Sequence, residues 1–147
     1  MKTTKQLLFL IAILTVSFCG ISFGQTTHVI TLNVDEDGTF SLSADADTEV
    51  VDDSSLEAFT ILVFEDDEIE WEGNADSGAV VDIEKIKFPK NAKPFKNKNL
   101  DGKKNNGKKK AKGKIAKNKK NKTYKYIMDF TVGGEPFSID PGLKVGQ

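Results

Sequence analysis

Arginine is absent from the 147 residues, and cysteine and histidine occur once each, as Cys19 and His28. Without a guanidinium the chain cannot make bidentate contacts to guanine or phosphate, so sequence-specific nucleic-acid recognition is not expected. One cysteine excludes an internal disulfide and a multi-thiolate metal site. Neither the single histidine nor any pair of carboxylates is marked by a catalytic motif, so we expect a protein that is not an enzyme and has no cofactor.

Long apolar runs are also scarce, and the only one lies at the N-terminus. Two lysines precede an almost uninterrupted apolar stretch over residues 7–16, and small residues stand at positions −3 and −1 before Gln25. This pattern is typical of a cleaved signal peptide, and the run is too short to remain as a membrane span. We expect residues 1–24 to be a signal peptide and residues 25–147 to be one domain, exported to the periplasm or the exterior.

Cys19 raises the alternative of a lipoprotein. Such signals normally carry a small residue before the modified cysteine, and here that residue is Phe18. Cleavage after Gly24 is therefore the prediction. It removes the cysteine together with two lysines, and the formal charge falls from −1 to −3.

Charge is divided sharply along the chain. Residues 35–84 hold eighteen acidic side chains and no basic one, whereas residues 85–125 hold eighteen lysines against one acid, Asp101. A formal charge near zero therefore conceals one negative and one positive half, which a partner would meet first.

Apolar residues alternate with polar ones in the mature chain, which indicates strands. Residues that face each other on paired antiparallel strands share a face, and only a three-residue loop over 36–38 satisfies this rule for the first two strands. Gly38 then supplies the left-handed residue that such a loop requires. The predicted partners are Ile30 with Ala44, Leu32 with Leu42, and Val34 with Phe40.

A second hairpin is predicted across the acidic turn at residues 65–68, and the out-of-phase Ile83 and Ile86 indicate a bulge. Gly133 and Gly134 mark a further turn. About seven short strands predict an all-β antiparallel Greek-key sandwich of immunoglobulin-like type. The strands are expected at residues 29–34, 40–44, 59–64, 68–72, 79–83, 85–88, 124–132, 137–139 and 143–145.

The lysine-rich segment 89–123 holds only three large apolar residues, Phe95, Leu100 and Ile115. So little apolar surface and so much like charge predict a mobile insertion between two core strands. Two alternatives stay open. The segment is compositional drift in a tolerant loop, or its lysines fold back over the acidic sheet of the same molecule or of a neighbour.

The acidic turn leading into Ile69-Glu70-Trp71 resembles the corresponding turn and strand of cupredoxin-like domains. Phe88-Pro89 through Pro94-Phe95, and the tail from Tyr124 to Leu143, are similar to later segments of small exported bacterial members of that family. The resemblance implies a Greek-key sandwich. It does not extend to copper, because a blue copper site needs a thiolate and two histidines that the mature chain lacks.

Three single features have structural interpretations. His28 is predicted to be a solvated residue near the mature N-terminus, although histidine could ligate metal or act as an acid or base. Trp71, in phase with Ile69, is predicted to be a core residue and not a sugar-binding platform. Asn33-x-Asp35-x-Asp37-Gly38 resembles the start of a calcium loop, but its twelfth position is Ala44, so a hairpin turn explains it better.

We therefore expect an exported, non-catalytic interaction module whose lysine-rich loop binds anionic polymers without sequence specificity. The expected partners are lipopolysaccharide, acidic polysaccharide or extracellular DNA, and self-association through acidic and basic faces is a further route. A metal-handling cupredoxin relative, for copper or calcium, is the alternative function. The candidate anion-binding residues are Lys103, Lys104, Lys108, Lys109, Lys110, Lys112, Lys114, Lys117, Lys119, Lys120 and Lys122.

Overall fold

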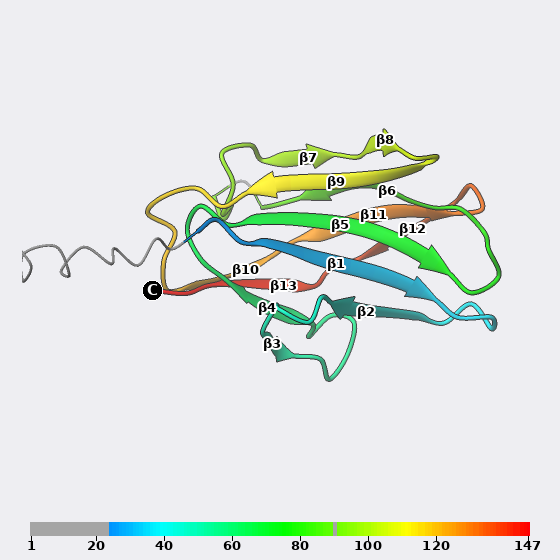
Figure 1. The fold of residues 1–147 in the computed structure, drawn as a ribbon, viewed down its shortest axis with the longest axis horizontal. Helices are drawn as coiled ribbons and strands as arrows, with labels where there is room; N and C mark the ends of the chain where they lie inside the picture. Colours follow the sequence, from blue (N-terminus) through cyan, green and yellow to red (C-terminus); the bar gives the residue numbers. More distant parts are fainter. Residues whose placement is uncertain (1–23, 90) are drawn as a thin grey trace, which may run out of the picture.

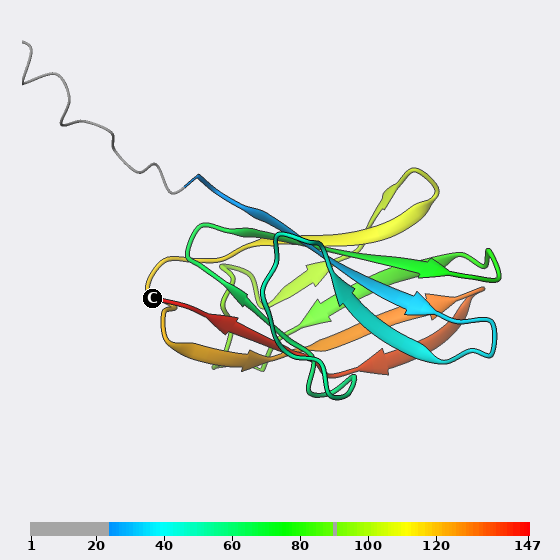
Figure 2. The same ribbon diagram turned by 60° about the horizontal axis from the view of Figure 1, so that its bottom comes forward.

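The computed structural model describes residues 24–89 and 91–147. The apolar leader and Cys19 lie outside the described residues. The described chain forms thirteen strands, arranged in the two facing layers of an all-β sandwich (Figures 1 and 2). None of the described residues belongs to a helix long and apolar enough to span a membrane.

One layer is a five-stranded sheet with the strand order β2 (Phe40–Ala44), β1 (Thr27–Val34), β5 (Glu68–Ala75), β9 (Lys108–Lys114) and β8 (Lys103–Asn105). The other layer contains two four-stranded sheets. The first has the strand order β10 (Lys122–Lys125), β13 (Gly142–Val145), β4 (Thr60–Val63) and β3 (Val50–Asp52). The second has the strand order β12 (Glu135–Ile139), β11 (Ile127–Val132), β6 (Val81–Lys87) and β7 (Asn99–Asp101). Neighbouring strands are antiparallel except β1 with β5 and β4 with β13.

The predicted first hairpin is confirmed. Ile30 pairs with Ala44, Leu32 with Leu42 and Val34 with Phe40. Gly38 has a φ of 83°, the left-handed conformation that closes the turn. Burial of Ile30, Leu32 and Val34 on one face fixed this register, because a shift of one residue would turn all three to solvent.

The predicted second hairpin is wrong. β4 pairs with β13 and β3, whereas β5 pairs with β1 and β9, so the turn at residues 64–67 carries the chain from one layer to the other. Similarly, the single strand expected over residues 124–132 is divided into β10 and β11, which belong to different sheets. Such changes of sheet explain why there are more strands than the expected seven, since periodicity does not show where a strand leaves one sheet for another.

The predicted bulge lies in β6. Phe130 pairs with Ile83 and Asp129 pairs with Lys85, so Glu84 is the extra residue. The Glu84 carbonyl accepts a hydrogen bond from the Gly102 amide at 2.8 Å. A Cβ on Gly102 would lie 1.8 Å from the Ile83 carbonyl oxygen, so only glycine allows this close approach.

The mobile insertion expected over residues 89–123 is wrong for most of its described residues. This segment contains β7, β8 and β9 and the start of β10, and β9 pairs with β5 in the five-stranded sheet. Its three large apolar residues, Phe95, Leu100 and Ile115, are all buried, together with Ala111. These side chains anchor the segment, and lysine–carboxylate pairs cover the exposed face.

Trp71 is fully buried, as predicted, at the centre of the sandwich. Its ring packs edge-on against Phe95 and Tyr126, and its Nε1–H donates to the Tyr126 hydroxyl oxygen at 3.1 Å. The core therefore joins the acidic β5, the lysine-rich segment and the C-terminal strands. Both halves of the charge pattern belong to one folded unit.

Candidate functional site

A ladder of ion pairs connects β9 to β5. Lys110 Nζ lies 2.9 Å from Glu70 Oε1 and 2.5 Å from Glu72 Oε2, and Lys112 Nζ lies 2.6 Å from Glu68 Oε1. Lys110 donates hydrogen bonds to Glu72 and Glu70, which raises the pKa of Lys110 above its ordinary value, and the hydrogen bond that Lys112 donates to Glu68 raises the pKa of Lys112. These lysines therefore lie over the acidic strand of the same molecule, which is one of the alternatives that the sequence left open.

The ladder divides the eleven candidate lysines into two groups. Five have carboxylate partners within the molecule: Lys109, Lys110, Lys112, Lys114 and Lys120. Six form no ion pair with any described residue: Lys103, Lys104, Lys108, Lys117, Lys119 and Lys122. Only the second group keeps its charge uncompensated for an external anion.

Five lysines converge on an open pocket of about 470 Å³. The only acid in its lining is Asp66, which lies 3.2 Å from Lys114 Nζ. Apart from Lys114, none of the lysines in this lining forms an ion pair with a described carboxylate. Lys93 instead donates a hydrogen bond to the backbone carbonyl of Lys96. The pocket, called here the lysine pocket, is lined by Asp66, Phe95, Ile115 and Ala116 and by Lys93, Lys96, Lys114, Lys117 and Lys119.

Two apolar anchors build the lysine pocket. Phe95 and Ile115 form an isolated antiparallel bridge and are 2% and 1% exposed. The Ala116 amide donates to the Pro94 carbonyl at 2.8 Å and holds the same two segments together. Because the apolar side chains point into the core, the lysines around them gather at the surface. Lys93 and Lys96 were not among the candidates, since only the bridge shows that they meet residues 114–119.

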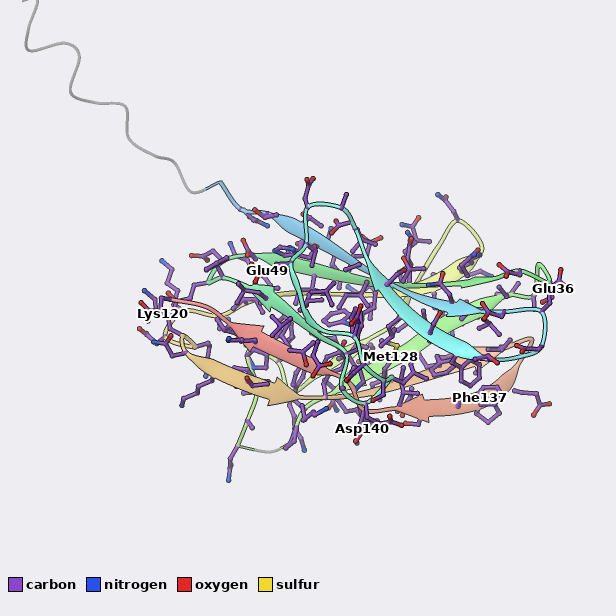
Figure 3. The ribbon with its side chains drawn as sticks, turned by 90° about the horizontal axis from the view of Figure 1, so that it is seen from below. Glu36, Glu49, Lys120, Met128, Phe137 and Asp140 are labelled. Atoms are coloured by element: carbon purple, nitrogen blue, oxygen red, sulfur yellow. The ribbon has the colours of Figure 1, made fainter. Side chains whose placement is uncertain are left out.

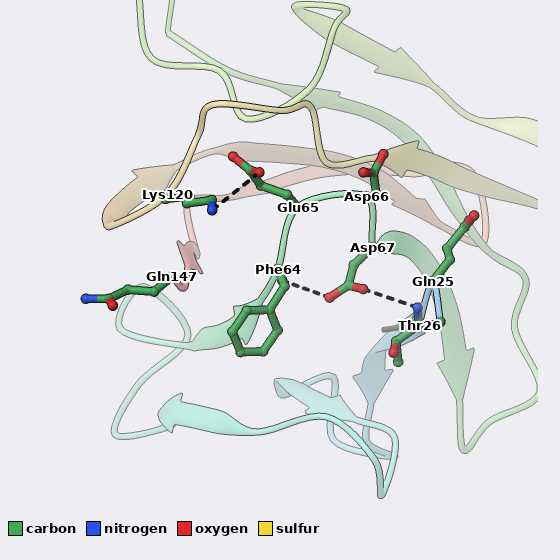
Figure 4. A pocket seen from close by; sticks show the side chains of 9 residues that line it. Gln25, Thr26, Phe64, Glu65, Asp66, Asp67, Lys120 and Gln147 are labelled. Atoms are coloured by element: carbon green, nitrogen blue, oxygen red, sulfur yellow. Dashed lines mark hydrogen bonds and ion pairs between the residues drawn. The ribbon is translucent and has the colours of Figure 1, made fainter. Parts of the chain in front are cut away.

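A second pocket, of about 510 Å³, lies on the other side of the acidic turn (Figure 4). Phe64, the turn residues Glu65, Asp66 and Asp67, and Lys120 line it together with both ends of the described chain. The carboxylate of Asp67 already has partners within the protein, because it accepts hydrogen bonds from the Phe64 and Thr26 amides. Asp66 lines both pockets, so the acidic turn separates this pocket from the lysine pocket.

His28 is not solvated, so that prediction is wrong. It is 5% exposed in β1, with Nε2 3.1 Å from Asp67 Oδ2 and Nδ1 2.7 Å from Thr48 Oγ1. Thr48 in turn donates to Asp45. This buried network ties β1 to the loop after β2 and to the acidic turn. It has the composition of a catalytic set, but the threonine hydroxyl already donates its proton to the carboxylate of Asp45.

Metal ligands do not converge in the described part of the chain, where no three side chains of His, Cys, Asp or Glu are grouped as a metal would require. The calcium-like segment forms the hairpin turn, with Asp37 accepting a hydrogen bond from the Thr39 amide at 2.9 Å. That contact lowers the pKa of Asp37. The carboxylate thus has a structural role in the turn.

No protein-family model and no curated protein matches the chain. Among solved structures, the chain is similar to the inclusion body protein PixA from Burkholderia cenocepacia J2315. The TM-score is 0.63 at 5% identity, over 86% of this chain and 98% of that one. At this identity the likeness concerns the fold alone.

Proposed function

We propose that the chain is an exported, non-catalytic β-sandwich module that binds anionic polymers at the lysine pocket. The observation that carries this proposal is the convergence of five lysines on one surface depression with a single carboxylate in its lining. On β9, Lys110 and Lys112 face glutamates, whereas four of the five lysines that line the pocket pair with no described carboxylate. Clustered, uncompensated charge attracts polyanions through counterion release.

Lysine chemistry sets the expected selectivity. An ammonium group is a point charge on a flexible stem, so it attracts phosphate, sulfate and carboxylate without the planar geometry that arginine imposes. The aromatic ring of Phe95 is buried and is not a platform for stacking bases. Binding should therefore follow charge density, and lipopolysaccharide, acidic polysaccharide and extracellular DNA share the required chemistry.

Export supplies the setting of this proposal. The apolar leader before Gln25 supports delivery to the periplasm or the exterior, where such polymers occur. We also propose a Greek-key arrangement related to cupredoxins. The Ile69-Glu70-Trp71 resemblance supports it, and both apolar residues of that motif are buried in β5. The metal-handling alternative has no observation in its favour, so it is not proposed.

The experiment is salt elution from immobilised heparin, a sulfated polysaccharide. We expect the purified protein to be retained at low salt and released as salt rises. Lys93, Lys96, Lys117 and Lys119 changed to Gln should abolish retention. The control changes Lys103, Lys104, Lys122 and Lys144 to Gln, which removes the same charge from exposed positions outside the pocket. It should retain most of the binding.

Two results would count against the proposal. Equal losses in the two variants would mean that overall charge, and not the lysine pocket, determines binding. No retention of the unmodified protein at low salt would rule out polyanion binding altogether.

A further inference from the structure

The chain changes layer at two opposite edges of the sandwich. After β2, residues 45–57 cross to the sheet that contains β3, and we call them the acidic crossover. Residues 98–108 run from β7 in one layer to β8 in the other, and we call them the basic crossover. Figure 1 shows β7 and β8 along one long edge and β2 and β3 along the other.

The acidic crossover carries only negative charge. It holds six carboxylates and no lysine, and none of the six forms an ion pair with a described residue: Asp45, Asp47, Glu49, Asp52, Asp53 and Glu57. In Figure 3, which looks onto this edge, Glu49 lies on the loop in front. Hydrogen bonds from Ser54 to Asp52 lower the pKa of that carboxyl and keep it charged.

The basic crossover has the opposite charge. It contains four lysines, Lys98, Lys103, Lys104 and Lys108, none of which pairs with a described carboxylate. Its single acid, Asp101, lies 3.2 Å from Lys85 and is thereby compensated. Lys103 and Lys104 stand on β8, where both are exposed.

Each crossover also presents an open strand edge. β8 ends the five-stranded sheet and β3 ends one four-stranded sheet, so no strand of the described residues pairs with the outer backbone groups of either. β3 exposes Val50 and Val51 at 39% and 45%. An unpaired edge is a template for another strand, but like charge opposes the pairing of identical edges. Two acidic edges repel, two basic edges repel, and only an acidic edge with a basic one attracts.

We propose that copies of this chain associate head to tail, with the basic crossover of one copy on the acidic crossover of the next. The strands β8 and β3 are equal in length. In antiparallel pairing of the two, Lys103 lies opposite Asp52, and Lys104 lies opposite Val51, whose apolar surface the lysine stem can cover.

The arrangement of the two surfaces determines the kind of assembly. Because they lie on opposite edges, each contact leaves one acidic and one basic crossover free. The contact is heterologous, and repetition gives open-ended chains of molecules and no closed dimer. This inference is independent of the proposed polyanion function, since the lysine pocket lies outside both crossovers.

The test measures the mass of the purified protein by light scattering at two ionic strengths. At about 0.01 M, where the Debye length is about 30 Å, we expect a mass that grows continuously with protein concentration. At about 1 M, where that length is about 3 Å, we expect monomers. A protein that is monomeric at both ionic strengths and at every concentration would overturn the proposal.

Charge reversal identifies the surfaces. Lys103→Glu with Lys104→Glu gives β8 a negative charge like that of β3, and Asp52→Lys with Asp53→Lys gives the end of β3 a positive charge like that of β8. In each variant alone the two strand edges repel, so each should be monomeric. An equimolar mixture should assemble again, because acidic and basic edges then alternate, and this recovery also shows that both variants are folded. Reversal of Glu36 and Glu135 to Lys, exposed positions outside the crossovers, should leave assembly unchanged. Assembly by either crossover variant alone, or failure of the mixture, would contradict the proposed contact.

Discussion

The hairpin β1–β2 and the ribbon formed by β8 and β9 are both antiparallel, but they are held in different ways. In β1 every second side chain is buried, from His28 to Val34. In β9 only Ala111 is buried, and lysines occupy five of the seven positions. β1–β2 is stabilised by apolar alternation, whereas β9 is stabilised by a few anchors and by ion pairs with β5.

The difference shows that a strand needs few apolar residues when its neighbour carries the opposite charge. Exposed cross-strand ion pairs contribute little one at a time. In β9 they are arranged along one strand, and buried residues flank them at Ala111 and Ile115. The anchors place the strand, and the pairs remove the repulsion that its five lysines would otherwise cause.

The largest expected loss of stability comes from truncating a buried side chain, and one such residue is compared from the β1–β2 hairpin and one from the lysine-rich segment. Ile30→Ala, in β1, and Ile115→Ala, after β9, should each cost about 2–5 kcal/mol, because both side chains are buried. Urea unfolding measures this as a lower midpoint at unchanged slope. A normal cost at Ile30 with almost none at Ile115 would show that the lysine-rich segment is separate from the core.

The close approach at Gly102 gives the next effect. Gly102→Ala should cost at least about 1–3 kcal/mol, because the new methyl group meets the Ile83 carbonyl oxygen at 1.8 Å. Ser41→Ala, at an exposed position of β2, is the neutral comparison. Unchanged thermal stability of Gly102→Ala would mean that the basic crossover does not pack on the β6 bulge.

Alkaline pH should weaken both the ribbon and the core. The hydrogen bonds that Lys110 donates to glutamates raise its pKa above 10.5, and burial raises the pKa of Tyr126 above 10.0. A group with a raised pKa keeps its proton in the folded protein at a pH where the unfolded chain has already lost it. Its contribution to the free energy of unfolding is therefore fully present below the ordinary pKa and is lost as the pH rises above that value.

Urea midpoints should thus be level from about pH 7 to 9 and fall above about pH 10. Tyr126→Phe should reduce the alkaline loss, while it lowers stability at pH 7 by about 1–3 kcal/mol because Trp71 Nε1–H loses its acceptor. A midpoint that rises above pH 10 would contradict the assignment.

The smallest effect concerns one rung of the ladder. A double-mutant cycle with Lys112→Met and Glu68→Gln should give a coupling of about 0.2–1 kcal/mol, because the lysine is half exposed. The coupling should shrink at high salt. The same cycle on Lys112 and Asp35, which do not form a pair, should give none.

Sequence patterns predicted the part of the fold that depends on alternation. The register of β1–β2, the Gly38 turn, the bulge and the core position of Trp71 follow from period and phase. The changes of sheet did not follow, because an alternating run such as that around Tyr126 has the same pattern whether it stays in one sheet or crosses to another.

The candidate site was predicted in kind but not in detail. A lysine count cannot show which lysines face glutamates, and this pairing separates Lys110 from Lys117. The spacing of Phe95, Leu100 and Ile115 was the available signal, since three buried side chains suffice to fix the segment. Nothing near His28 in the sequence identifies Asp67, 39 residues away, as its partner.

The central claim is that β9 is a true strand of the sandwich, and amide hydrogen exchange tests it most directly. The amides of β9 that pair with β5 across residues 111–114 should exchange as slowly as those of β1, whose partner is the same strand. Protection should persist at high salt, because the buried anchors remain when the ion pairs are screened. Exchange of residues 111–114 at the rate of an unstructured chain, while β1 stays protected, would contradict the account.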